Sequence, residues 1–401
     1  MKIYIKHISN TYNYGSCMMA INLIYELYKN NEFIEFYVDA ASKSDLERLK
    51  IETNCKNIKK DNFGDQNNRY HSKIDKLFKK IGIDKGVSKI ENVIVIGGDD
   101  ISEYYGVKHL ENELNSILEE SHKKKVILLG QTMGPFTGNR ADMARECLKN
   151  TKIYVRDNEC LKYLLKHEFK NVNNGRDLAF LDLPMQHNAN TILNKYNIKK
   201  DNYITIVPSG LTKCYTDDLE AYISENVKII EEIIINEKLK NKNIVLLPHV
   251  LLPSHVDDRL IIRELMNRLD ASIKNRIIAI DDDMLPSEAR EILGNGLFTI
   301  TGRMHAAVST FFMRKPAISL SYSVKYKGVI GDGLDMNELV VEATDNKLWA
   351  TGEISSQVLE KVDYIVSNYD SLVKKIDINV SQTSDIVNLQ LKDLKEELKL
   401  L

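Results

Sequence analysis

The sequence predicts an α/β fold of two Rossmann-like domains that face a cleft, followed by helices at the carboxyl end. Short β-prone runs alternate with helical runs in the first half of the chain, which is the pattern of a parallel sheet covered by helices. The same alternation restarts after a polar passage near the middle. The length of 401 residues also favours more than one core, because domains average roughly 150 residues.

The first predicted domain covers residues 1–185, where runs rich in Ile, Val and Tyr alternate with amphipathic runs. Its predicted strands are 3–6, 34–38, 92–96, 125–129 and 152–155. Its predicted helices are 16–29, 109–120, 139–149 and 158–167. Residues 56–89 are rich in Lys, Asn and Asp and read as an insertion with one short helix at 73–80.

The second predicted domain covers residues 200–345, and it begins after a polar, Asn-rich passage that is typical of a linker. Its predicted strands are 204–207, 243–247, 276–280, 297–300 and 317–320. Its long predicted helices are 217–236 and 255–269. Residues 346–401 are predicted to form a carboxyl-terminal helical segment.

The composition is that of a soluble globular protein, with 43% hydrophobic and 28% charged residues. The 55 basic and 57 acidic side chains give a net charge of −2, which argues against a general nucleic-acid-binding protein. The start of the chain lacks the apolar core of a signal peptide, and no apolar run reaches the roughly 20 residues that span a bilayer. We therefore expect a cytoplasmic protein whose five cysteines stay reduced, since no Cys-x-x-Cys spacing occurs.

The segment Thr301-Gly302-Arg303-Met304-His305 joins a predicted buried strand to a predicted helix at 306–314. Such strand-to-helix turns are where α/β proteins bind anions. The guanidinium of Arg303 offers a fork of donors to a carboxylate or phosphate, and the imidazole of His305 can transfer a proton near neutral pH. The pair therefore suits an acidic substrate. Taken alone, the pattern also fits an arginine that caps a carbonyl and a histidine that starts a helix.

Other predicted strands lead into polar or glycine-rich turns at the sheet edge where α/β proteins hold ligands. Three such turns hold candidate site residues. The turn after strand 3–6 contains Asn13 and Gly15, the turn after strand 92–96 contains Gly98, Asp99 and Asp100, and the turn after strand 125–129 contains Gln131. Glycine permits close approach of a ligand, although ordinary βα turns have a similar composition. Neither the dinucleotide fingerprint Gly-x-Gly-x-x-Gly nor a P-loop occurs, which argues against a dehydrogenase or a P-loop NTPase.

Further basic side chains stand near strand ends. Arg156 is a candidate second anion clamp, or else a surface partner of Asp157. Lys325 or Lys327 is a candidate partner for phosphate, and we expect one of the two to be a solvated lysine.

One histidine follows the predicted strand at 243–247. His249 is a candidate site-lining or structural residue. Its spacing from His255 and Asp257 matches no established metal site, so we predict that no metal is bound there.

Taken together, these segments resemble the polysaccharide pyruvyl transferase family, over a stretch from about Asn13 to Lys327. In chain order, the matching pieces are Asn13-Tyr14-Gly15, Gly97-Gly98, Gln131-Thr132-Met133-Gly134-Pro135-Phe136, Val155-Arg156-Asp157, Asp177-Leu178-Ala179-Phe180, Leu247-Pro248-His249-Val250, Gly302-Arg303-Met304-His305 and Ser321-Tyr322-Ser323-Val324-Lys325. Two positions depart from the family. A third glycine is often seen where Asp99 stands, which bears on the acceptor side, and a serine is common where Cys160 lies.

The resemblance implies a fold of the GT-B type and a pyruvyltransferase of cell-envelope polysaccharide biosynthesis. Such a transferase moves a pyruvyl unit from phosphoenolpyruvate onto two hydroxyls of a sugar, forms a cyclic ketal and releases phosphate without a cofactor. The implied partners are phosphoenolpyruvate and a sugar or glycan acceptor, which includes a lipid-linked precursor at the inner face of the membrane. Residues 56–89 are a candidate membrane-surface contact in that setting.

The resemblance also assigns roles to residues of this chain. His305 is the implied general acid and base, and Asp99 or Asp100 is the implied carboxylate that stabilises the cation at the donor's central carbon. The second domain is expected to bind the donor and the first domain the acceptor. The expected substrate-binding residues are Arg156, Arg303, Lys325, Asn13, Gly15, Gly98, Gln131 and His249.

Two other functions fit the same architecture, because a fold does not determine function. One is a GT-B-type glycosyltransferase that uses a nucleotide sugar. The other is a non-catalytic carbohydrate-binding or scaffold protein, which predicts a degraded site, whereas Arg156, Arg303 and His305 are all present.

Overall fold

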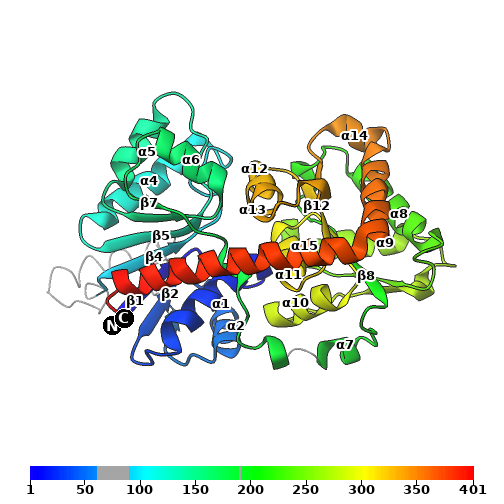
Figure 1. Cartoon of the computed structure of the whole chain (residues 1–401), viewed down its shortest axis with the longest axis horizontal. Coiled ribbons are helices and arrows are strands. Elements are labelled where there is room, and N and C mark those ends of the chain that lie inside the picture. Colours follow the sequence, from blue (N-terminus) through cyan, green and yellow to red (C-terminus); the bar gives the residue numbers. More distant parts are fainter. Residues whose placement is uncertain (61–89, 189–190) are drawn as a thin grey trace, which may run out of the picture. The chain divides into compact units, whose positions relative to one another are not determined.

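The computed structural model describes residues 1–60, 90–188 and 191–401, and it has the predicted α/β architecture (Figure 1). The predicted helix at 73–80 and most of the predicted insertion lie outside the described residues. The chain divides into two compact units. Unit 1 consists of Met1–Thr11, Leu23–Gly175 and Leu389–Leu401, and unit 2 consists of Tyr12–Asn22 and Arg176–Asn388. The predicted boundaries at residues 185 and 200 fall downstream of the change of unit at Gly175 and Arg176.

Among the described residues of unit 1, a seven-stranded sheet has the order β3-β2-β1-β4-β5-β6-β7. All of its strand pairs are parallel, and the order reverses between β1 and β4. The strands are β1 (Lys2–Lys6), β2 (Glu35–Val38), β3 (Ile58–Lys60), β4 (Asn92–Ile96), β5 (Lys125–Gln131), β6 (Lys152–Val155) and β7 (Val172–Asn173). Five of these strands were predicted. The two edge strands β3 and β7 were not, because they are too short to show a periodic pattern.

The helices that begin in the first part of the chain are α1 (Tyr14–Tyr28), α2 (Lys43–Thr53), α4 (Val107–Ser121), α5 (Arg140–Leu148) and α6 (Asn158–Lys166). Helices α4, α5 and α6 cover one face of the unit 1 sheet, and their apolar side chains pack with those of β4, β5 and β6 (Figure 1). Helix α2 was not predicted, although its start carries a clear signal. Ser42 and Asp45 form a reciprocal capping box there.

The sheet of unit 2 has six strands in the order β10-β9-β8-β11-β12-β13, again with parallel pairs. Its strands are β8 (Tyr203–Val207), β9 (Asn243–Leu246), β10 (Ile277–Ala279), β11 (Thr299–Thr301), β12 (Ala317–Ser321) and β13 (Val340–Glu342). The first six strands of each sheet therefore follow the same Rossmann-like order, which confirms the predicted pair of Rossmann-like domains. The order in unit 2 reverses between β8 and β11.

The main helices of unit 2 are α7 (Thr191–Lys195), α8 (Leu219–Ile235), α9 (Asp258–Arg268), α10 (Pro286–Asn295), α11 (Met304–Phe312), α12 (Val324–Tyr326), α13 (Asp332–Leu334) and α14 (Asn346–Ala350). Helix α9 begins later than predicted, because residues Ser254–Val256 form a separate 3-10 turn. Helix α10 was not predicted, although Pro286 at its first position is a typical helix start.

The carboxyl-terminal segment is helical, as predicted, and forms the long helix α15 (Glu353–Glu397), which is kinked at Asn368. Its last part belongs to unit 1. There Asp393 accepts hydrogen bonds from Lys152 at 3.0 Å and from the Tyr154 hydroxyl at 2.6 Å. In the part of the chain that the structure describes, no helix is both long enough and apolar enough to cross a membrane.

Candidate functional site

Arg303 and His305 lie where the sequence predicted, at the carboxyl end of β11 and in the first turn of α11. Thr301 ends the strand, and its hydroxyl accepts a hydrogen bond from the amide of Arg303 at 2.8 Å. Arg303 has extended backbone angles (φ −109°, ψ 113°) and immediately precedes the helix. Because β11 pairs with β8 where the strand order reverses, this turn stands at the usual ligand-binding edge of an α/β sheet.

Two buried tyrosines hold the carbonyl oxygen of Gly302, next to Arg303. The Tyr215 hydroxyl donates to it at 2.5 Å and the Tyr326 hydroxyl at 2.6 Å. Burial raises the pKa of both hydroxyls well above the ordinary value, so both remain protonated donors. A β-carbon at position 302 would come within 2.8 Å of the Tyr215 hydroxyl, which explains the glycine.

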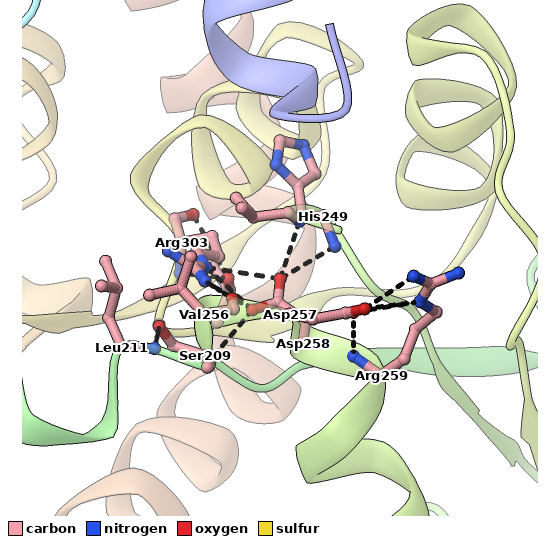
Figure 2. A network of polar contacts seen from close by, with 12 residues as sticks. Ser209, Leu211, His249, Val256, Asp257, Asp258, Arg259 and Arg303 are labelled. Atoms are coloured by element: carbon pink, nitrogen blue, oxygen red, sulfur yellow. Dashed lines mark hydrogen bonds and ion pairs between the residues drawn. The ribbon is translucent and has the colours of Figure 1, made fainter. Parts of the chain in front are cut away.

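The guanidinium of Arg303 forms a buried ion pair with Asp258 (Figure 2). Its Nη2 donates to Oδ1 of Asp258 at 2.6 Å and to the carbonyl of Val256 at 2.9 Å, and its Nε donates to Oδ1 at 3.1 Å. Burial lowers the pKa of Arg303, but the charge and hydrogen bonds of Asp258 raise it more, so the guanidinium stays charged. Of the two expectations for Arg303, the structure shows the carbonyl contact, and the anion that it pairs with is Asp258 of the same chain.

Asp258 was not predicted as a site residue, yet it connects three loops at the carboxyl edge of the unit 2 sheet. It is fully buried at the start of α9. Besides Arg303, it accepts hydrogen bonds from the amides of Gly210 at 2.7 Å, His249 at 3.0 Å and Val250 at 2.9 Å. The loops after β8, β9 and β11 are therefore fixed to one carboxylate.

His305 is paired with a different buried carboxylate. Its Nε2 lies 3.1 Å from Oδ2 of Asp177, and Asp177 is fully buried while the His305 side chain is 16% exposed. On the other side of the ring lies Gly15. A β-carbon at position 15 would come within 2.6 Å of the His305 β-carbon and closer still to Nδ1, so only glycine fits. The structure thus brings together two residues that the sequence indicated separately.

His249 is 1% exposed, and its ring is unpaired at Nε2 among the residues that the structure describes. Burial, followed by the positive charges of His305, Arg303 and Arg290, lowers the pKa of His249 well below its ordinary value. The imidazole of His249 is therefore neutral at neutral pH. A neutral imidazole can donate a hydrogen bond from one ring nitrogen and accept one at the other.

The polar turn that precedes α1 packs against the His249 loop, because Tyr12–Asn22 belongs to unit 2. Asn13 forms an antiparallel bridge with Val250, and the amide of Tyr14 donates to the carbonyl of His249 at 3.1 Å. The rings of Tyr14 and His249 also meet edge to face, with centroids 5.5 Å apart. Of the predicted residues, Asn13, Gly15, His249, Arg303 and His305 are gathered in unit 2.

Lys325 is buried, whereas Lys327 is exposed. Lys327 is therefore the solvated lysine of the two. The ammonium of Lys325 donates to the Tyr322 hydroxyl at 2.8 Å. Tyr322 in turn contacts Tyr215 and Tyr326, with centroids 5.4 and 5.3 Å apart. Lys325 therefore belongs to the cluster that surrounds the Gly302 carbonyl.

In unit 1, the structure gathers Gly98, Gln131 and Arg156 at the carboxyl ends of β4, β5 and β6. Thr132 links them, because its amide donates to Gly98 at 2.9 Å and its hydroxyl accepts from Nε of Arg156 at 2.8 Å. The side chain of Gln131 is fully buried and donates to the Val95 carbonyl at 3.2 Å. Its Oε1 has no hydrogen-bond partner among the described residues.

The two predicted carboxylates of unit 1 have different surroundings. Asp99 is 7% exposed and accepts a hydrogen bond from the Tyr105 hydroxyl at 3.1 Å. Asp100 is more exposed and lies 3.7 Å from Nδ1 of His7. Neither belongs to a metal-binding cluster, since no group of three or more His, Cys, Asp or Glu side chains within residues 1–60, 90–188 and 191–401 is arranged to hold a metal ion.

The fold and this strand-edge site define an α/β protein of the GT-B type, which solved structures support. A UDP-GlcNAc 2-epimerase from Neisseria meningitidis bound to UDP-GlcNAc has a TM-score of 0.60 at 10% identity, covering 99% of this chain and 100% of that chain. The S. aureus MnaA–UDP co-structure has a TM-score of 0.60 at 13% identity, covering 100% and 97%. A glycosyltransferase from Rickettsia africae has a TM-score of 0.55 at 14% identity, covering 99% and 97%.

The family is more specific than the fold. The family model of polysaccharide pyruvyl transferases matches residues 13–324, and the chain belongs to this family. A curated relative is the amylovoran biosynthesis protein AmsJ of Erwinia amylovora. It is 24% identical over 309 residues, which are 74% of this chain and 70% of the relative.

Proposed function

We propose that this protein transfers a pyruvyl group from phosphoenolpyruvate to two hydroxyls of a sugar and releases phosphate. The sugar belongs to a cell-surface polysaccharide or to its lipid-linked precursor, and the product is a cyclic pyruvate ketal. Membership of the polysaccharide pyruvyl transferase family supports the reaction class. The observation that carries the proposal is the His305 imidazole, which is held on the buried carboxylate of Asp177 and stands two residues after Arg303.

The proposed reaction needs a group that can both give and take a proton. Protonation of the methylene carbon of phosphoenolpyruvate makes its central carbon cationic, and a sugar hydroxyl that loses its proton then attacks that carbon. Phosphate leaves, and the second hydroxyl closes the ketal in the same way. His305 is our candidate for the proton transfers. No cofactor takes part in the proposed reaction, because the donor carries its own leaving group.

The donor carries a carboxylate and a phosphate, so its binding calls for cations. Arg303 uses Nε and Nη2 for Asp258 and Val256, and its Nη1 has no partner within the described residues. We assign Nη1 to the donor's acidic groups. Lys325, in the neighbouring tyrosine cluster, is our candidate for the phosphate. His249, neutral and with Nε2 unpaired, is a candidate hydrogen-bond partner of the donor.

We assign the acceptor sugar to the carboxyl edge of the unit 1 sheet. The unpaired Oε1 of Gln131 is an acceptor suited to a sugar hydroxyl. Asp99 and Asp100 are candidates for stabilising the developing cation, and Arg156 is the candidate second anion clamp. The backbone of Gly98, with no side chain in the way, allows close approach of the ligand. In this proposal the protein acts in the cytoplasm, at the inner face of the membrane when the acceptor is lipid-linked.

The test is phosphate release from phosphoenolpyruvate across a panel of sugar and glycan acceptors, followed by detection of the ketal by mass spectrometry. We expect acceptor-dependent release with at least one pyranoside. Thermal-shift measurements with phosphoenolpyruvate and with UDP- and GDP-sugars provide the second arm. Stabilisation by a nucleotide sugar but not by phosphoenolpyruvate would overturn the proposal in favour of a glycosyltransferase. Stabilisation by a glycan, without turnover of either donor, would favour a carbohydrate-binding protein.

A further inference from the structure

The turn that carries Asp177 is held by side chains from distant parts of unit 2. Asn22 Nδ2 donates to the carbonyl of Leu178 at 2.7 Å, and the Ser384 hydroxyl donates to that of Phe180 at 2.9 Å. Arg290 donates to the carbonyls of Ala179 and Leu181, both at 2.7 Å. Each of the four consecutive carbonyls after Asp177 therefore has a side-chain partner.

Arg290 is fully buried, and nothing in the sequence pattern marked it as important. Its guanidinium also lies over the ring of Phe312, 4.8 Å from the centroid. A buried guanidinium is costly unless its donors are satisfied, and here they bind the backbone of one short turn. Arg290 thus gives the Asp177 turn a rigid support, of the kind that holds a reactive group in one orientation.

The Asp177 carboxylate has little freedom on this turn. Its Oδ1 accepts a hydrogen bond from the amide of Ala179 at 3.0 Å, and its Oδ2 faces Nε2 of His305 at 3.1 Å. An ionised carboxylate only accepts hydrogen bonds, so Nε2 of a neutral His305 carries the proton that it donates to Asp177. The lone pair of the neutral imidazole is then on Nδ1.

The surroundings of Nδ1 agree with this assignment. Nδ1 has no hydrogen-bond partner among the described residues, and it lies on the side of the ring that faces Gly15. A β-carbon at position 15 would overlap this side of the ring. Glycine allows this close approach of the α1 backbone to Nδ1, although alanine would stabilise a helix better at such a position.

We propose that Asp177 is a positioning residue that selects Nδ1 of His305 as the nitrogen that moves the proton. Gly15 lies beside that nitrogen, where any side chain would overlap the ring. The inference rests on the proposed function for the identity of the reaction. The tautomer itself follows from the geometry of Asp177 and His305 alone. In the proton transfers, Nδ1 of the imidazolium gives its proton to the methylene carbon of the donor and then takes the proton of the attacking hydroxyl, and the imidazolium is stabilised by the Asp177 carboxylate, which keeps its own charge.

The first test is nuclear magnetic resonance of protein labelled with ¹⁵N-histidine, at a pH where the imidazoles are neutral. A His305→Gln spectrum identifies the His305 signals among those of the nine histidines. We expect Nε2 of His305 to carry the proton in the wild-type protein and Asp177→Asn to change the tautomer, because an amide can donate to Nε2. A wild-type His305 protonated at Nδ1, or a tautomer that Asp177→Asn leaves unchanged, would overturn the inference.

The second test is kinetic. Asp177→Asn should lower kcat for phosphate release by about 100- to 10,000-fold while changing the KM for phosphoenolpyruvate little, as expected for loss of imidazole orientation. Asp345→Asn is the matched control, since Asp345 also caps a short helix by accepting from the amide two residues on, at 2.9 Å. Equal effects of the two substitutions would contradict the inference. Absence of phosphate release from the wild-type protein would defeat the proposed function and leave the tautomer result standing.

Discussion

Two histidines of unit 2 each lie beside a buried aspartate, yet the two pairs are connected differently. Asp177 faces the ring of His305 at Nε2. Asp258 instead bonds the backbone amide of His249, and its remaining acceptor capacity goes to Arg303 and other amides. The ring of His249 is left without a carboxylate and is held neutral by burial. A nearby carboxylate therefore orients an imidazole only when it reaches the ring.

The largest effect that tests this comparison is catalytic. His305→Gln should lower kcat for phosphate release by about 100- to 10,000-fold and leave donor binding largely intact, because it removes the proton carrier and leaves Arg303 and Lys325 in place. His249→Gln should change kcat less than about tenfold, since His249 stays neutral. Phosphate-release rates and calorimetric binding of phosphoenolpyruvate measure the two quantities. Near-wild-type turnover by His305→Gln would refute the role of His305.

The second prediction concerns the Asp258 side of the comparison. Asp258→Asn removes the charge that pairs with the buried Arg303, so it should lower the free energy of unfolding by about 3–5 kcal/mol. Urea unfolding measures the change. The neighbouring Asp257→Asn is the matched control, because Asp257 caps α9 and bonds Arg259, and asparagine caps nearly as well. Asp257→Asn should lower the free energy of unfolding by no more than about 1 kcal/mol. Equal losses in the two variants would contradict the inference that the charge of Asp258 stabilises the buried Arg303.

The buried ring of His249 predicts a dependence of stability on pH. Its folded-state pKa lies below the unfolded value of about 6.5, so the unfolded chain binds the proton more readily. The contribution of His249 is complete above about pH 6.5 and is lost at about 1.4 kcal/mol per pH unit as the pH falls toward the folded-state pKa.

The measurement compares urea unfolding of wild type and His249→Gln between pH 7.5 and pH 5. At pH 7.5 the difference between the two proteins reports packing alone. Below about pH 6.5 the wild type should lose stability faster than the variant, because only the wild type takes up this proton on unfolding. Parallel curves would show that the ring is not held neutral.

The smallest effect concerns the turn that both Arg303 and His305 share. Tyr326→Phe removes one of two donors to the Gly302 carbonyl and should cost about 0.5–1.5 kcal/mol, as should Tyr215→Phe. The double variant leaves a buried carbonyl unsatisfied, so its cost should exceed the sum of the single costs. Thermal unfolding measures all three, and strict additivity would contradict the shared role.

Local patterns carried most of what could be predicted from the sequence. The apolar run before Gly302 and the helical run after it place Arg303 and His305 correctly, because a strand followed by a helix is encoded within one short segment. Helix α2 was not predicted, although its start also has a local signal, the capping box formed by Ser42 and Asp45.

The partners of the site residues could not be predicted in the same way. Asp258 is 45 residues from Arg303, Asp177 is 128 residues from His305, and Tyr215 is 87 residues from Gly302. Periodicity carries no information on which strand edges meet, so these contacts appear only once the order of the strands is known. The support of the Asp177 turn by Arg290 had no local signal at all.

The segment Tyr12–Asn22 limits how this protein can be divided and recombined. It belongs to unit 2, although more than 150 residues of unit 1 follow it before unit 2 resumes at Arg176. A fragment that starts at Arg176 would lack the strand partner of Val250 and the donor to the His249 carbonyl. A single crossover between related genes within residues 23–175 would therefore separate Gly15 from the His305 beside which it lies. Unit 2 could be exchanged between related chains only if Tyr12–Asn22 were exchanged together with the residues that follow Gly175.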